Sequence, residues 1–107
     1  MENNNFIDKI VLLNEEIDYS KNAIVSKIIL ENGNGNITLF AIDEGQFLSE
    51  HTAPFDAMVQ ILEGEAKIII DKKPFLLNEG KMIIMPKNIP HALQALKSFK
   101  MLLTMIK

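Results

Sequence analysis

The sequence predicts a single all-β domain built as a small antiparallel barrel or sandwich. Short runs rich in Ile, Val, Leu and Phe alternate with turn residues at intervals of roughly 8–12 residues, which is typical of sandwiches and barrels. No stretch keeps apolar residues at helical spacing for long between good caps. The length of 107 residues, with 48% hydrophobic and 23% charged residues, suits one domain with a single core.

The N-terminal half of the chain contains the clearest turn. Residues 6–13 are apolar and irregular and fit either a short helix or a loop, and the polar residues 14–19 predict a loop. The Asn-Gly-Asn-Gly-Asn sequence at residues 32–36 predicts a hairpin turn because Asn and Gly tolerate positive φ angles. Strands are predicted on both sides of this turn and after it, at residues 24–30, 37–42 and 47–51.

The C-terminal half consists of shorter strands between turns that contain Gly, Asp, Asn or Pro. We predict strands at residues 57–62, 66–70, 75–77, 82–85, 91–95 and 99–106. The predicted barrel therefore spans residues 24–107 of a single domain, 1–107. We expect residues 1–23 to form an N-terminal segment that packs on the barrel or swaps into it.

The composition excludes several classes of function. The chain has no cysteine, so disulfide scaffolds, thiolate metal sites and a cysteine nucleophile are ruled out. The net charge is -3 and all 11 basic residues are lysines, which argues against a nucleic-acid partner. The first residues lack the pattern of a secretory signal, and the apolar runs fall far short of the about 20 residues that span a membrane. We expect a cytoplasmic protein with neither nucleic acid nor membrane as a partner.

The two histidines, His51 and His91, are the side chains best suited to carry chemistry. Each lies at the edge of a predicted strand beside a proline-containing loop. Imidazole is the commonest side-chain metal ligand and titrates near neutral pH. Two histidines 40 positions apart form no motif by themselves, so spacing alone favours a structural role for each over metal binding.

The segment around the first histidine resembles the first motif of the cupin superfamily. That pattern is Gly, five residues, His-x-His, three or four residues, Glu, six residues and Gly. Here Gly45, His51 and Gly64 match it, while Ala53 stands at the second histidine and Ala57 at the carboxylate.

The second histidine lies in a segment that resembles the second cupin motif: Gly, five residues, Pro-x-Gly, two residues, His, three residues and Asn. Gly80, Pro86 and His91 match this pattern, whereas Asn88 replaces its second Gly and Ala95 its Asn. Both histidines of the chain thus fall on ligand positions of the family, and the resemblance extends from about residue 24 to the C-terminus.

Resemblance to cupins implies an antiparallel jelly-roll barrel with an internal metal site. Members of the family mostly bind one divalent metal through three imidazoles and a carboxylate, a set that suits first-row metals. Here only His51 and His91 remain of those four ligands. Two imidazoles completed by water make a weaker site than the three protein ligands of catalytic zinc centres. The candidate cofactor is therefore a weakly held divalent iron, manganese, nickel or zinc.

Three polar residues close to the first motif could replace the missing ligands: Glu50, Asp56 and Gln60. Strand alternation places Gln60 on the face opposite Ala57. Glu50 and Asp56 also have the wrong parity, unless Pro54 or a β-bulge shifts the register. Whether any of the three completes the site stays open at this stage.

The same alternation predicts an apolar pocket around the histidines. Phe47 and Ser49 share the parity of His51 on their strand. Four methionines lie on strands expected to wall the barrel, where core filling is their more frequent role: Met82, Met85, Met101 and Met105.

Three functions fit this sequence. The favoured one is an uncharacterised small cupin that binds a small ligand or, weakly, a divalent metal. The alternatives are a metal-dependent enzyme of the dioxygenase or isomerase type and a dimeric structural barrel without a working site. The fold selects neither substrate nor reaction, so enzymatic activity stays open. A homodimer is expected because strands at residues 25–30 and 99–106 would leave edges and apolar faces exposed in a monomer; the small cupins that the chain resembles usually dimerise.

Overall fold

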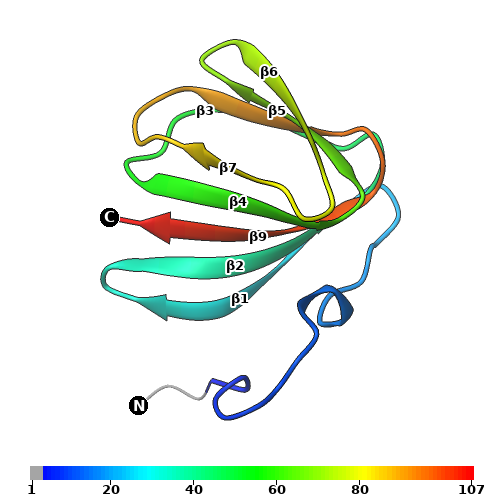
Figure 1. Cartoon of the computed structure of the whole chain (residues 1–107), viewed down its shortest axis with the longest axis vertical. Helices are drawn as coiled ribbons and strands as arrows, with labels where there is room; N and C mark the ends of the chain where they lie inside the picture. Colours follow the sequence, from blue (N-terminus) through cyan, green and yellow to red (C-terminus); the bar gives the residue numbers. More distant parts are fainter. Residues whose placement is uncertain (1–3) are drawn as a thin grey trace.

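The computed structural model describes residues 4–107, and this part of the chain folds into nine strands in two antiparallel sheets. The larger sheet has the order β1-β2-β9-β4-β7 and the smaller one the order β3-β8-β5-β6 (Figure 1). The larger sheet comprises β1 (Ile24–Asn32), β2 (Gly35–Ile42), β9 (Phe99–Ile106), β4 (Asp56–Glu63) and β7 (Met82–Met85). The smaller one comprises β3 (Phe47–His51), β8 (His91–Ala95), β5 (Glu65–Ile70) and β6 (Lys73–Asn78). The predicted all-β jelly-roll fold is confirmed, with every expected strand present.

Side chains from alternate positions of both sheets fill the space between them. On β4, Ala57, Val59 and Ile61 are 5%, 0% and 2% exposed, whereas the residues between them are only partly buried. This period of two is what a strand with one face on the core requires. Phe99 and Ile68, both 0% exposed, belong to the same cluster from β9 and β5, so the two sheets share one core.

The N-terminal segment forms a second apolar layer on the outer face of the five-stranded sheet. Residues 6–12 form turns and coil, and a short 3-10 helix, η1 (Leu13–Glu15), begins at the last residue of the 6–13 stretch. Ile17 is 4% exposed and packs with Leu39 and Ala41 of β2, both 0% exposed. The described part of the segment therefore packs on the barrel of its own chain; residues 1–3 of the predicted 1–23 segment lie outside the described residues. No helix within residues 4–107 has the length and apolar character needed to cross a membrane.

A polar cluster fastens this segment to the sheet. The Tyr19 hydroxyl donates to a Glu63 carboxylate oxygen over 2.8 Å, and the Asn14 amide donates to the other oxygen over 3.3 Å. The Lys100 ammonium, on a side chain only 10% exposed, lies 3.9 Å from Glu63 and donates to the Asn14 carbonyl. We call these four residues the clasp. Because each buried charge in it has an opposite charge or a hydrogen-bond partner, burying the clasp is tolerated.

Gly64, between β4 and β5, allows the chain to reverse against β9. Its φ of +86° lies in the left-handed region, and a Cβ at this position would lie 2.1 Å from the Ser98 carbonyl oxygen. Only glycine fits both requirements. The family-pattern glycine at this position therefore has a steric reason in this chain.

Candidate functional site

The two histidines, distant in sequence, lie side by side at the junction of β3 and β8. His51 and His91 are directly paired in the register of these antiparallel strands. Their ring centroids are 4.3 Å apart and the rings meet edge to face at 67°. His91 is 6% exposed, whereas His51 is exposed. The structure thus brings together both predicted site residues, one inside the barrel wall and the other open to solvent.

A β-bulge in β3 makes this pairing possible. Leu48 pairs with Leu93, but the next pair is His51 with His91, so β3 uses one residue more than β8 over this interval. The extra residue shifts His51 onto the face of Leu48, which packs against the core. The prediction that Phe47 shares the face of His51 is therefore wrong, because it assumed an uninterrupted pleat. Phe47 is 67% exposed.

Both imidazoles are held by the same hydrogen bond to their own backbone. Nδ1 of His51 lies 2.8 Å from the Ser49 carbonyl oxygen, and Nδ1 of His91 lies 3.2 Å from the Ile89 carbonyl oxygen. A carbonyl oxygen accepts only, so Nδ1 carries the proton and donates in each ring. A neutral imidazole in this tautomer keeps a lone pair on Nε2, which is the form that ligates metals.

The electrostatic surroundings keep His91 neutral. Burial lowers the pKa of His91 below its ordinary value of 6.5, and the nearby His51 lowers it further. The hydrogen bond to the Ile89 carbonyl raises this pKa, but it does not outweigh burial. A neutral imidazole at physiological pH is available as a ligand without first losing a proton.

The loop before β8 positions His91 by docking on the chain after β3. The backbone N–H of Asn88 donates to the Ala53 carbonyl over 2.8 Å, and the backbone N–H of Lys87 donates to Asp56 Oδ1 over 3.0 Å. Asn88 has a φ of 63°, in the left-handed region where Asn is the best tolerated residue after Gly. This explains how Asn can stand where the second cupin motif has its second Gly.

Among the residues that the structure describes, no carboxylate completes a metal-binding group with the two histidines. Within residues 4–107, no group of three or more His, Cys, Asp or Glu side chains is placed to hold a metal ion. Neither Glu50 nor Asp56 therefore joins the histidines in such a group, although a bulge does shift the register of β3 as considered above. Gln60 pairs with Leu102 and lies on the face opposite Ala57, as predicted.

Most of the methionines fill the core, which is the more frequent of their two expected roles. Met85 and Met101 are 3% and 1% exposed within the core, and Met105 packs against it. Met82 was expected to wall the barrel interior, but it is 47% exposed, because its pairing with Gln60 turns it to the outer face. Two hollows, of about 670 and 210 Å³, lie along the outside of β1 and between β1, β2 and β9, and no histidine lines either.

The chain is similar to a known family and to several solved structures. Residues 38–107 match the family model described as "Cupin domain". A conserved protein of unknown function from Streptococcus pyogenes is 39% identical, with a TM-score of 0.92, and the match covers 98% of this chain and 92% of that one.

Two further structures are similar. The cupin 2 conserved barrel domain protein from Leptotrichia buccalis is 39% identical with a TM-score of 0.85, over 88% of this chain and 46% of that one. A cupin superfamily protein from Desulfitobacterium hafniense is 28% identical with a TM-score of 0.87, over 94% and 93% of the two chains. No curated protein matches the sequence.

Proposed function

The chain belongs to the cupin family, and from this premise we propose that it is a small binding module whose two histidines reversibly hold a divalent transition metal. The observation that carries the proposal is the matched pair of Nδ1 hydrogen bonds, which directs the Nε2 lone pair of both rings away from the backbone. His51 and His91 would supply two ligands, and water or a small ligand would complete the coordination shell.

The donor set favours binding over catalysis by a tightly held metal. Alanine occupies two of the four ligand positions of the family pattern, at Ala53 and Ala57, and methyl groups donate nothing to a metal. Two imidazoles suit iron, manganese, nickel or zinc, but they hold such ions less firmly than three protein ligands do. Because His51 is exposed, a small molecule from solution could reach the coordination positions of the metal that the two histidines leave open.

Metal titration of tag-free protein tests this proposal. We expect the wild type to take up about one zinc or nickel ion per chain in calorimetry and to release it on gel filtration, as a two-ligand site should. His51→Gln and His91→Gln each remove one ligand and should abolish uptake. Glu50→Gln is the matched control and should bind like the wild type. Asp56→Asn keeps an oxygen that can accept the hydrogen bond from Lys87 and tests whether the Asp56 carboxylate takes part in binding; we expect it to bind like the wild type as well.

Two results would refute the proposal: a wild type that takes up none of the four metals, or uptake that persists in both histidine variants. Loss of uptake in Asp56→Asn alone would instead identify a three-ligand centre. That outcome would direct the search towards the metal-dependent enzyme hypothesis, with substrates of the dioxygenase or isomerase type.

A further inference from the structure

Two methionines flank the alanine that stands at the carboxylate position of the family pattern. Ala57 of β4 pairs with Met85 of β7 on one side and with Met105 of β9 on the other. Directly paired residues point to the same side of a sheet, and Ala57 belongs to the core between the two sheets. Met85, 3% exposed, is part of this core, and Met105 packs against it. The two thioethers therefore lie on the inner face of the five-stranded sheet, one on each side of a methyl group.

The methionines and the histidines lie at the same end of the barrel. His51 is the last residue of β3, and Ala57 is the second residue of β4. Met85 is the last residue of β7, and His91 is the first residue of β8. One short connection between the two sheets thus joins each of these pairs. In Figure 1 β7 and β9 both point to the left-hand end of the barrel, where β4 begins, and Met105 lies near this end of β9.

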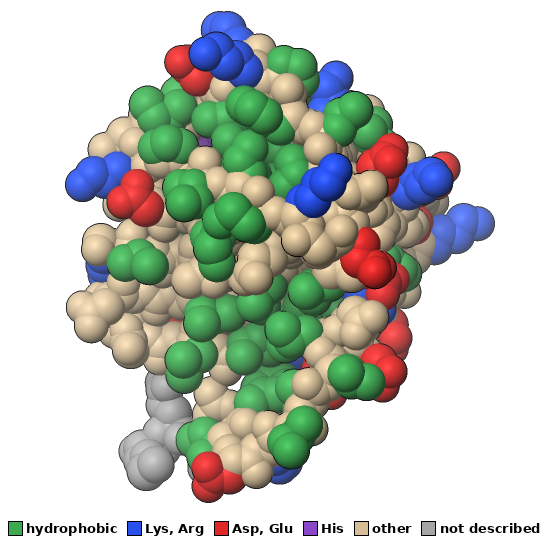
Figure 2. Space-filling model, viewed as in Figure 1, with side chains coloured by type: hydrophobic (Ala, Val, Ile, Leu, Met, Phe, Trp, Pro, Cys, Tyr) green, Lys and Arg blue, Asp and Glu red, His purple; other side chains and the backbone are tan. Residues whose placement is uncertain are grey.

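The imidazoles belong to the sheet opposite the methionines. On β8 every second residue is buried, from His91 through Leu93 to Ala95, and the last two are part of the core. His91 therefore points into the barrel, and the ring of His51, its partner on β3, lies 4.3 Å away. Packed sheets lie about 10 Å apart, a distance that an imidazole and a thioether reaching from opposite sheets span together. In Figure 2 a histidine shows at the upper left only as a small patch between tan and green atoms.

We propose that this site takes cuprous copper, held by Nε2 of His51 and His91 together with the thioether sulfur of Met85, Met105 or both. The inference rests on the histidine site proposed above and adds ligands from the opposite sheet. Imidazole suits copper, and thioether sulfur is a soft donor that selects monovalent copper over the divalent metals considered above. The sulfurs take the place of the two ligands that the alanines of the family pattern do not supply.

Charge also favours a monovalent ion at this place. The inner faces of the sheets are apolar, and within residues 4–107 no carboxylate completes a metal-binding group with the histidines. Burying a charge without an opposite charge costs free energy, and the cost rises with the magnitude of the charge. A monovalent ion with neutral ligands is therefore accommodated at a lower cost than a divalent ion.

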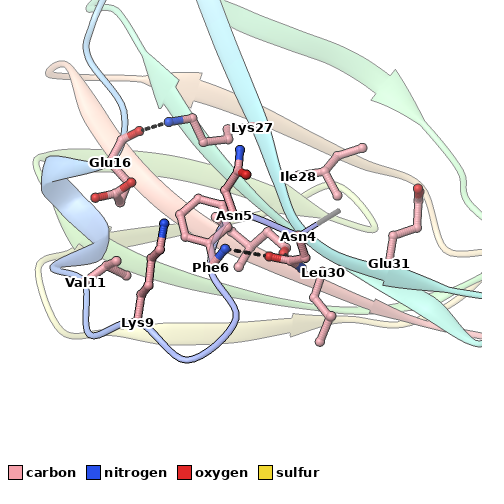
Figure 3. Close-up of a pocket in the computed structure, with 11 residues that line it drawn as sticks. Asn4, Asn5, Phe6, Lys9, Val11, Glu16, Lys27, Ile28, Leu30 and Glu31 are labelled. Carbon is pink, nitrogen blue, oxygen red and sulfur yellow. Dashed lines mark hydrogen bonds between the residues drawn. The ribbon is translucent and has the colours of Figure 1, made fainter. Parts of the chain in front are cut away.

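The larger of the two hollows offers no comparable donors. Its lining, between the N-terminal segment and β1, contains Lys9, Glu16, Lys27 and Glu31 but neither imidazole nor thioether (Figure 3). The Lys27 ammonium donates to the Glu16 carbonyl oxygen within it. Oxygen donors and ammonium groups do not suit cuprous copper, so we expect one copper ion per chain, at the histidines.

Competition for cuprous copper tests the proposal. Tag-free protein in ascorbate under nitrogen is titrated against a coloured chelator that is specific for the cuprous ion. The wild type should take one ion per chain, and His91→Gln should abolish this uptake. The double variant Met85→Leu with Met105→Leu should bind at least about 10- to 100-fold more weakly, which is the usual cost of altering groups that merely orient metal ligands. Leu is close to Met in volume, so the core is retained, and circular dichroism verifies the fold.

Met101→Leu is the matched control. Met101 is 1% exposed on the same strand and the same face as Met105, about 13 Å away along β9. This variant should bind copper like the wild type. X-ray absorption at the copper edge gives a second readout: sulfur neighbours should be present in the wild type and in Met101→Leu, and absent in the double variant.

Zinc titration of the same variants separates this inference from the function proposed above. Zinc uptake that depends on the histidines, with equal copper affinity in the wild type and the double methionine variant, would overturn the inference alone. A loss of copper binding in Met101→Leu as large as in the double variant would also overturn it, because the cause would be a general disturbance of the core. Copper uptake without uptake of a divalent metal would refute the divalent site and support the copper centre, whereas no uptake of any metal would refute both.

Discussion

The two faces of the five-stranded sheet are built from alternating residues of the same strands, yet they are buried in different ways. Phe99 points into the barrel and is 0% exposed, while its neighbour Lys100 points outward and is still only 8% exposed. The inner face is closed by the second sheet, and the outer face is closed by the N-terminal segment over part of its length. On the part of the outer face that the segment leaves open, Leu30 and Ile84 are 52% and 56% exposed.

The polar groups of the clasp differ from those of the histidine pair in how many of their hydrogen bonds are formed within the fold. In the clasp, the polar atoms of Tyr19, Glu63 and Lys100 bind one another or the chain, so their hydrogen-bonding capacity is used within the fold. At the histidine pair, the backbone engages only Nδ1 of each ring. A buried polar network that satisfies itself stabilises a fold, whereas the Nε2 lone pairs of the histidines are the basis of the metal binding that we propose.

The largest effects are expected from truncating buried side chains on the two faces of the five-stranded sheet. They test whether the outer layer contributes as much to stability as the barrel interior does. Phe99→Ala, on the inner face, should lower the free energy of unfolding by about 3–5 kcal/mol, through lost burial and a cavity. Leu39→Ala, on the outer face, should cost about 2–5 kcal/mol, because Leu39 is also 0% exposed beneath the N-terminal segment. Urea unfolding of both variants measures these changes.

The matched control for both substitutions is Leu76→Ala, at a side chain that is 65% exposed. It should change stability by less than about 0.5 kcal/mol. If Leu39→Ala cost no more than this control, the segment would not form a second layer, and the comparison of the two faces would fail.

Local pattern was sufficient to predict the strands. The family motifs, not the local pattern, directed attention to the two histidines, which the structure places side by side. The alternation of residues 57–62 correctly placed Ala57 inside and Gln60 outside, because β4 is a regular strand over this stretch. The same argument failed on β3, where the bulge between Leu48 and His51 changes the parity. Nothing in the sequence at Ser49 identifies a bulge, since its formation depends on pairing with β8.

The N-terminal segment was expected to pack on the barrel or swap into it, but the contacts that hold it in place could not be predicted, for a different reason. The clasp joins Asn14 to Lys100, 86 positions later, and Tyr19 to Glu63, 44 positions later. Residues 14–19 looked like a polar loop because only Ile17 and Tyr19 in it are large and apolar. The one available clue was a single lysine within the apolar run of residues 99–106, which requires a partner if it is buried.

A smaller effect is expected from loosening the clasp without removing its packing. Tyr19→Phe keeps the ring but deletes the hydroxyl that donates to the Glu63 carboxylate, and should cost about 1.5–3 kcal/mol, as for other hydrogen bonds to charged groups. A double-mutant cycle with Glu63→Gln, followed by urea unfolding, isolates this bond. A coupling energy near zero would show that the hydroxyl does not hold the segment.

The same tyrosine provides an optical check. Burial and the bond to Glu63 raise the pKa of Tyr19 above its ordinary value of 10.0. The chain has one tyrosine and no tryptophan, so ultraviolet absorbance reports phenolate formation at this site alone. In the folded protein the phenolate should appear only above the pH at which the urea-unfolded chain forms it. Coincident titrations would contradict the buried clasp.

The smallest effect concerns the histidine pair and its dependence on pH. Because the pKa of His91 is lowered in the folded state, the unfolded chain binds more protons than the native one just below pH 6.5. Stability contributed by neutral His91 is therefore fully present above pH 6.5 and declines as the pH falls through the window below it. Urea unfolding at pH 7.5 and 5.5 should show this decline in the wild type and a smaller one in His91→Gln. Proton NMR gives the direct measurement: with His51→Gln leaving one imidazole resonance, His91 should titrate below 6.5. A midpoint at or above 6.5 would mean that burial does not dominate the surroundings of the ring, and the contrast between an open His51 and a His91 set into the barrel wall would not hold.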